Sequence, residues 1–315
     1  MATLKYSTDE LIEEVRNRGS LGDNNAKGFL DADIIRYLNA EMYNELVPRV
    51  LKVREEYFVV RQRKTVAARV RIDPRAIGNR LRELVHIDTD GMRSNLPRID
   101  PSQFYYFNQD LNEAISGFSF EGNHVIPVPP EADLSGEYEM SWFFRPGQLV
   151  LIAEGREVAS ITDANTVEVT SAIPASFAVG VKVDVHSGFS GAEIKTWSNV
   201  LAAGTTSTTV NFTDNIDGSV GGTTAVEVGD YVVLENEAVI PGLPRELHPI
   251  LAQAATARIL EADGDEVGVK LATAELNRML LNMNYLIDDR IEGQAQKIVN
   301  RGSLLWKGRG YRRGW

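Results

Sequence analysis

The sequence predicts an α+β fold: a helical bundle formed by N- and C-terminal helices, with a β-rich middle and an inserted small β-barrel or sandwich domain. Two observations predict it. Apolar residues recur at helical spacing near both ends of the 315-residue chain, and alternating β-branched runs fill the region between them. A chain of this length can bury a sizeable core and hold two or three domains.

Two helices are expected near the N-terminus. Ser7 is placed to cap the first, with acidic residues in its first turn, and Gly19 ends it. Asp31 or Asp33 caps the second, and Pro48 kinks or ends it. The apolar residues of the second helix are Ile34, Ile35, Leu38, Met42, Leu46, Val50 and Leu51.

The periodicity changes from helical to alternating near Tyr57. Strands are expected over 57–63, 65–72 and 81–87, the first two with basic outward positions. A hairpin turns at Gly122-Asn123, and a last aromatic strand follows over 137–144. Together these segments predict the β-rich middle.

The segment 147–240 differs in composition, because it is rich in Thr, Val, Gly and Ala and contains only strand and turn patterns. It is expected to be an inserted all-β domain. Helical spacing returns at Leu243 and again over 266–288. The expected core is therefore 1–146 plus 241–300, and an extended arm occupies 301–315.

Charge is unevenly distributed along the chain, whose formal net charge is −11. Residues 49–82 hold eleven cations and three acids, a net charge of +8, whereas residues 151–240 hold three cations and twelve acids, a net charge of −9. This pattern indicates either surfaces for different neighbours or solvated faces whose charges pair elsewhere in the chain.

The segment 301–315 combines five cations with three aromatic residues and has no acid. Its four glycines disfavour a stable helix or strand. It is either a frayed end or a docking arm that becomes ordered on a partner, and the exposed tryptophans favour the arm. The expected docking residues are Leu304, Leu305, Trp306, Lys307, Arg309, Tyr311, Arg312, Arg313 and Trp315.

Several function classes have no support in the sequence. The chain has no cysteine, and its four histidines, His86, His124, His186 and His248, lie far apart, so no metal site or thiol chemistry is expected. Phosphate-binding and nucleophile motifs are missing, so neither a cofactor nor an enzymatic activity is expected. A pair of acids for glycoside cleavage stays open, because their separation is a tertiary property. No secretion signal and no membrane span are expected.

The order of motifs resembles the head-to-tail adaptor (connector or neck) proteins of tailed bacteriophages. It consists of an amphipathic helix, a Gly/Asn loop, a second long helix and basic strands. These are followed by four motifs: Leu81-Arg-Glu-Leu-Val85, Val125-Ile-Pro-Val-Pro-Pro130, Tyr138-Glu-Met-Ser-Trp-Phe-Phe-Arg-Pro-Gly-Gln-Leu-Val150 and Leu243-Pro-Arg-Glu-Leu-His-Pro-Ile-Leu251. The similarity covers residues 5–150 and 241–300, and 147–240 is larger than a minimal member of this family needs.

The resemblance implies a virion structural protein at the neck, assembled in the host cytoplasm. It would form a homo-oligomeric ring, usually of twelve copies, that binds the portal protein through its C-terminal arm. Tail or nozzle proteins would bind below, and genomic DNA would pass through the channel without specific contacts. It implies no catalytic residues and no membrane.

Two other functions stay open. A receptor- or glycan-binding virion protein would use the insert as its binding module and would present exposed aromatic residues, for example around Phe189 and Trp197. A nucleic-acid binder would use 49–82 and the basic arm, but the acidic total argues against it.

Overall fold

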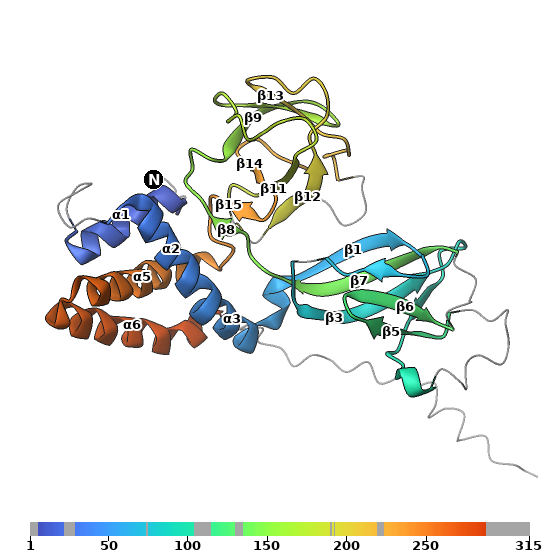
Figure 1. The fold of residues 1–315 in the computed structure, drawn as a ribbon, viewed down its shortest axis with the longest axis horizontal. Coiled ribbons are helices and arrows are strands. Elements are labelled where there is room, and N and C mark those ends of the chain that lie inside the picture. The colour runs from blue at the N-terminus through green and yellow to red at the C-terminus, as the bar shows by residue number, and fades with distance from the viewer. Residues whose placement is uncertain are drawn as a thin grey trace, which may run out of the picture.

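The computed structural model describes residues 6–21, 29–73, 75–103, 115–129, 135–189, 191, 193–218 and 224–287. In these residues the chain forms fifteen strands in four sheets. The helices gather at one end of the molecule, away from the four-stranded sheet that contains β1, β7 and β3 (Figure 1).

The expected fold class is wrong, because the described residues are mostly β-sheet and a bundle of N- and C-terminal helices does not form the body of the fold. The helices α1 (Thr8–Gly19) and α2 (Asp31–Glu41) have only 12 and 11 residues, whereas α6 (Glu266–Ile287) has 22. At 1.5 Å per residue α1 and α2 are about half as long as α6, too unequal for a matched bundle. Helical spacing of apolar residues predicts that a helix exists, but it does not predict what share of the fold the helices make up.

The first helix begins where the sequence predicts. The Ser7 side chain accepts a hydrogen bond from the backbone N–H of Glu10 at 3.4 Å, which satisfies one of the free donors of the first turn. Ser20 closes the helix in a left-handed conformation, and its N–H donates to the carbonyls of the last turn. The buried apolar residues of α1 are Leu11, Ile12 and Val15.

The second predicted helix is divided into three parts. α2 runs into a π-helical turn (Met42–Leu46), which is followed by α3 (Val47–Val53) and a 3-10 turn (Glu55–Phe58). Pro48 lies in the first turn of α3, where its missing N–H removes no α-helical hydrogen bond. The α-helical conformation therefore resumes after the π-helical turn, and Pro48 is compatible with the first turn of α3.

α5 (His248–Asp263) is buried on nearly all sides and contacts α1, α2 and α6. Arg18 of α1 donates to Gln253 of α5 at 2.6 Å, and Gln253 donates to the backbone carbonyl of Ala272 in α6 at 3.0 Å. Gly264, with φ 79°, ends α5 and allows the turn into α6.

The core sheet is antiparallel, with strand order β1-β7-β3-β4. Its strands are β1 (Val59–Thr65), β7 (Glu137–Phe144), β3 (Ala76–Ile87) and β4 (Arg93–Asn95). A smaller sheet has the order β2-β6-β5, from β2 (Val70–Arg71), β6 (His124–Val128) and β5 (Gly117–Glu121), and it contains the predicted hairpin at Gly122-Asn123.

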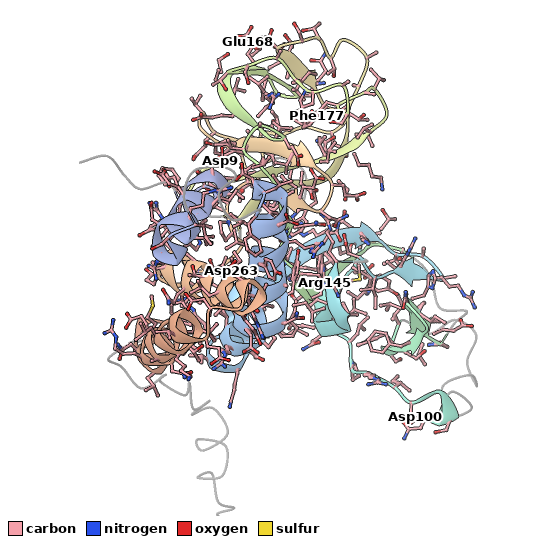
Figure 2. All side chains as sticks on the ribbon, turned by 60° about the vertical axis from the view of Figure 1, so that its left-hand side comes forward. Asp9, Asp100, Arg145, Glu168, Phe177 and Asp263 are labelled. Atoms are coloured by element: carbon pink, nitrogen blue, oxygen red, sulfur yellow. The ribbon has the colours of Figure 1, made fainter. Side chains whose placement is uncertain are left out.

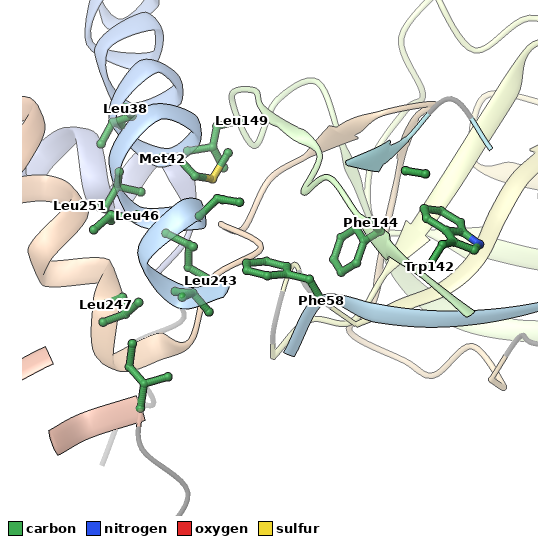
Figure 3. Packing of buried hydrophobic residues seen from close by; sticks show 14 of the residues in the cluster. Leu38, Met42, Leu46, Phe58, Trp142, Phe144, Leu149, Leu243, Leu247 and Leu251 are labelled. Carbon is green, nitrogen blue, oxygen red and sulfur yellow. The ribbon is translucent and has the colours of Figure 1, made fainter. Parts of the chain in front are cut away.

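One apolar cluster joins the helices to these two sheets. In Figure 3, Phe58 lies between Leu243, on the helical side, and Phe144 of β7. Phe58 is fully buried, and Trp142 and Phe144 are each 1% exposed. The helices and the core sheet are therefore stabilised by the same burial of apolar surface.

The insert is a six-stranded antiparallel sheet with its own apolar cluster, which includes Val167, Val183, Val210 and Phe212. Its order β12-β11-β14-β9-β10-β13 comprises β9 (Arg156–Asp163), β10 (Thr166–Val169), β11 (Lys182–His186), β12 (Ile194–Val200), β13 (Thr209–Asn211) and β14 (Tyr231–Leu234).

A short parallel pair lies where the chain leaves the core for the insert and returns from it. β8 (Gln148–Leu149) pairs with β15 (Glu237–Ala238). Asn39 of α2 holds this pair, because its amide donates to the carbonyl of Leu149 at 3.0 Å and accepts from the N–H of Leu149 at 2.8 Å. The insert is thus anchored to the helices at its base.

Candidate functional site

The predicted docking residues, all within 301–315, lie outside the described residues. They stay a prediction, as does the role of the arm. The set comprises Leu304, Leu305, Trp306, Lys307, Arg309, Tyr311, Arg312, Arg313 and Trp315.

The aromatic platform expected of a receptor- or glycan-binding insert is not formed by Phe189 and Trp197. Phe189 is 67% exposed. Trp197 is half-buried, and it packs against the apolar cluster that joins the helices to the two sheets. Its ring lies 5.8 Å from that of Trp142 and 5.7 Å from that of Phe144. Trp197 therefore attaches the insert to the core sheet instead of facing a ligand.

Arg75 makes the main polar connection between the core sheet and the insert. Its Nη1 donates to both carboxylate oxygens of Asp184 in β11, at 3.1 and 3.2 Å, and its Nε and Nη2 donate to Asp73 at 3.0 and 2.9 Å. Nη2 also donates to the hydroxyl of Ser198 at 3.1 Å, and the guanidinium lies 4.4 Å above the ring of Trp197. We call these five residues the Arg75 cluster.

The Arg75 cluster buries one guanidinium between two carboxylates. The side chains of Arg75 and Asp184 are 8% and 1% exposed. Burial alone would raise the pKa of Asp73, but its hydrogen bonds and ion pair with Arg75 outweigh burial and hold that pKa below its usual value. Burial opposes the charge of Arg75 as well, and its carboxylate partners raise its pKa above the usual value. Both groups stay ionised in the folded protein.

Asp184 has further donors that fix its position. The backbone N–H groups of Ser198 and Asn236 donate to its two oxygens at 2.7 and 2.9 Å. Ser198 and Asn236 both have positive φ, 45° and 70°, which turns these N–H groups toward the carboxylate. These donors satisfy the hydrogen-bonding capacity of the buried carboxylate and hold it in place.

The Arg75 cluster was not predicted from the sequence. β11 has the sequence Lys182-Val-Asp-Val-His186, and this alternation is equally typical of a strand with Asp184 on a solvated face. The identity of the partner was not readable, because Arg75 is 109 residues away in the chain.

A cavity of about 860 Å³ lies beside the Arg75 cluster, where the helices, the core sheet and the insert meet. The π-helical turn contributes Tyr43 and Asn44 to it, and such turns are frequent at functional sites. Figure 2 shows Arg145 at this junction, between the α2–α3 helices and the core sheet. The lining residues are Tyr43, Asn44, Val47, Pro48, Leu51, Arg75, Ile77, Arg145, Pro146, Gln148 and Asn236.

The chemistry of this cavity suits hydrogen bonding. Tyr43 donates to the carbonyl of Pro146 at 2.9 Å, and burial raises the pKa of Tyr43 to about 12 although Arg145 opposes the shift. Arg145 is exposed, and the amides of Asn44 and Gln148 are exposed beside it. These groups can bind a polar chain segment, but they do not form a nucleophile with an adjacent base.

Several cations of the basic band are paired within the chain. Glu139 of β7 pairs with Arg63 of the band, at 3.4 Å, and with Arg93, which lies outside the band, at 2.5 Å. Arg69 pairs with Glu121, and Arg82 lies 3.9 Å from each of two acids in the 3-10 turn. Glu139 and Glu121 lie outside 49–82, so the pairing interpretation of the basic band holds for Arg63 and Arg69, whereas the two acids beside Arg82 belong to the band itself.

Within the described ranges, no group of three or more metal-ligating side chains comes together, and no helix there is both long and apolar enough to cross a membrane. No family model matches this sequence, and no curated protein matches it.

Proposed function

We propose that this chain is a structural protein of a tailed-phage virion, a head-to-tail adaptor that forms a ring between the portal and the tail around the DNA channel. One observation carries the proposal: the separate segments whose order resembles that family pack into one apolar cluster. Its members include Leu84 of β3, Val125 of β6, Trp142 of β7, Leu149 of β8 and Leu243, Leu247 and Leu251 at the start of α5.

The arrangement of the insert supports the same proposal. The part of the chain that exceeds a minimal adaptor has its own apolar cluster, and it leaves and rejoins the core at the adjacent strands β8 and β15. An insertion of this kind can be added to an adaptor core without changing that core.

The charge of the protein suits a DNA channel. DNA binds strongly to cationic surfaces through its phosphates, so a channel wall must keep free cations few if DNA is to slide. The net charge of −11 and the internal pairing of Arg63, Arg69 and Arg75 support the proposal.

The proposed partners are the portal protein above, tail or nozzle proteins below and further copies of this chain, twelve in a ring. In this proposal segment 301–315 docks on the portal, with Trp306, Tyr311 and Trp315 as apolar anchors and its arginines as ion-pair donors. Twelve arms on one ring would bind with avidity, so each contact can be weak.

The test is native mass spectrometry of the full chain mixed with purified portal rings of the same virion. Addition of about twelve copies per portal ring is expected, with loss of binding when 303–315 is removed. Two matched variants separate the contributions of the arm: replacement of its three aromatic residues by Ala, and replacement of Arg309, Arg312 and Arg313 by Gln. No association of the wild-type chain with portal rings would refute the proposed function.

The receptor- or glycan-binding alternative has less support, because Trp197 faces the core. A glycan array probed with the full chain tests it directly. Specific glycan binding that is lost in Phe189→Ala would favour this alternative over the adaptor.

A further inference from the structure

The cavity beside the Arg75 cluster has the size and the position of a ligand-binding pocket. Its volume is about 860 Å³, and pockets for small ligands commonly measure about 300–1,000 Å³. It lies where three parts of the fold meet: the π-helical turn with α3, the core sheet, and β8 with Asn236 at the base of the insert. Such junctions are frequent places for binding sites. We call it the junction cavity.

Part of the lining of the junction cavity is apolar. Val47 and Leu51 of α3 and Ile77 of β3 contribute to it, together with Pro48 and Pro146. Val47 and Pro146 are buried, whereas Leu51 and Ile77 are half-buried and Pro48 is exposed. The cavity therefore offers apolar surface that a ligand can still cover, and removing this surface from water favours binding.

Arg145 supplies the charge that is available to a ligand. Among the described residues its guanidinium has no ion-pair or hydrogen-bond partner, and no acid lines the cavity. The other arginine of the lining, Arg75, is already occupied, because its Nε, Nη1 and Nη2 all donate within the Arg75 cluster. Arg145 is exposed, and it lies close enough to Tyr43 for its charge to oppose the rise in the pKa of that phenol. A ligand in the junction cavity therefore meets one unpaired positive charge.

Two exposed amides add hydrogen-bonding groups. Asn44 lies in the π-helical turn and Gln148 in β8, and both line the junction cavity. A side-chain amide both donates and accepts, so it can bind the backbone or a carboxylate oxygen of a ligand. Tyr43 is less available, since its hydroxyl already donates to the carbonyl of Pro146 at 2.9 Å.

We propose that the junction cavity binds a carboxylate carried by an apolar group. The carboxylate pairs with Arg145, the apolar group covers Leu51 and Ile77, and the amides of Asn44 and Gln148 bind the polar atoms that remain. A guanidinium matches a carboxylate through two parallel N–H···O bonds. A phosphate fits less well, because one unpaired guanidinium balances only part of its charge of about −2.

Two sources can present this chemistry: a polypeptide with an acidic side chain beside an apolar one, and a free organic acid. The cavity lies within a single chain, so the proposal does not rest on the adaptor function. Two pairs of probes distinguish the sources. The peptide acetyl-Leu-Glu-Leu-amide is compared with acetyl-Leu-Gln-Leu-amide, and phenylacetate is compared with phenylacetamide.

Saturation-transfer NMR with the full chain measures the dissociation constant of each probe. At least one acid is expected to bind, and its matched amide at least about tenfold more weakly, because the amide cannot form the ion pair. Arg145→Gln is expected to weaken binding of the acid at least about tenfold, and Arg145→Lys, which keeps the charge but loses the fork, to weaken it less. Arg61→Gln is the matched control and should bind like wild type, since Arg61 is an exposed arginine of β1 outside the cavity.

The outcomes decide between the sources and test the site. Binding of the peptide alone would assign the site to a polypeptide partner, and binding of phenylacetate alone to a free acid, and both results support a carboxylate site. The proposal is overturned if neither acid binds, if each amide binds as tightly as its acid, or if Arg145→Gln binds like wild type. It is also overturned if Arg61→Gln loses as much affinity as Arg145→Gln, because binding would then reflect overall charge alone. Circular dichroism melts of each variant verify folding.

Discussion

At the scale of single residues, Arg75 is the side chain on which the attachment of the insert depends. Replacing it with Ala would leave Asp184, 1% exposed, without its cation. Removing one partner of a buried ion pair typically costs about 3–5 kcal/mol, so Arg75→Ala is expected to lower the free energy of unfolding by about 3 kcal/mol or more. Urea unfolding followed by circular dichroism measures the change.

Two further variants make that experiment specific. Arg75→Lys keeps the charge but loses the forked geometry that serves Asp73 and Asp184 together, so its cost should be intermediate. Arg145→Ala removes an exposed arginine from the same cavity and should change stability by less than about 0.5 kcal/mol. Equal losses for Arg75→Ala and Arg145→Ala would show that the buried ion pair contributes nothing.

His248 is expected to make the protein sensitive to acid. It is fully buried, its Nε2 donates to the carbonyl of Leu243 at 3.1 Å, and burial lowers its pKa to about 4. The unfolded chain binds a proton near pH 6.5 and the folded chain does not, so the free energy of unfolding falls as the pH drops from about 6.5 to about 4, by about 3 kcal/mol in all. Burial also lowers the pKa of His186, which adds a loss of the same sign.

Urea unfolding across this pH window provides the measurement. His248→Gln retains a donor for the carbonyl of Leu243 but does not titrate, so its stability should depend less steeply on pH than that of wild type, by about one proton. A wild-type slope in His248→Gln would contradict the role of His248.

At the scale of elements, Asn39 connects α2 to β8. Both of its amide hydrogen bonds go to Leu149, and Asn39 is 7% exposed. Asn39→Ala would leave the N–H and the carbonyl of Leu149 without these partners, at an expected cost of about 2–4 kcal/mol. Hydrogen exchange of the Leu149 amide should accelerate by the same free energy. Asn44→Ala, at an exposed position in the π turn, should cost less than about 0.5 kcal/mol, and a similar loss in both variants would contradict this assignment.

The elements also show what local sequence could predict. α1 and the Gly122-Asn123 hairpin were predicted correctly, because a cap, a breaker or a tight turn fixes each of them within a few residues. The strand expected over 65–72 shrinks to Val70–Arg71, because pairing with β6, and not local propensity, determines its extent. The π turn inside the second helix had no sequence signal that distinguished it from α-helix.

The candidate sites were predictable to different degrees. The range of α6 was predicted almost to the residue, but the sequence could not show which apolar residues of that helix face outward. The Arg75 cluster and its cavity join residues from six separate segments, so they exist only in the folded chain. The fold class was predicted wrongly for a related reason. It depends on the proportion of helix to strand in the folded chain, and the described residues form fifteen strands.

At the scale of the whole molecule, the insert is expected to be removable. β8 and β15 are parallel, so a linker must return along the length of one strand, and about twelve Gly and Ser residues in place of 153–234 provide that crossover. The shortened chain should unfold in one cooperative transition, because the apolar cluster that joins helices and core sheet keeps nearly all its members. It should be less stable than the full chain, since Trp142 and Phe144 lose their contact with Trp197.

This deletion also measures how strongly the insert and the core are coupled. Asp184 and Ser198 leave with the insert, so in the shortened chain Arg75 retains Asp73 and becomes accessible to water. Arg75→Ala should then cost about 1 kcal/mol or less, as exposed ion pairs do, against about 3 kcal/mol or more in the full chain. The difference between the two backgrounds is the coupling energy of the Arg75 cluster. An equal cost in both would mean that the insert is held by apolar contacts alone, and that its orientation does not depend on Arg75.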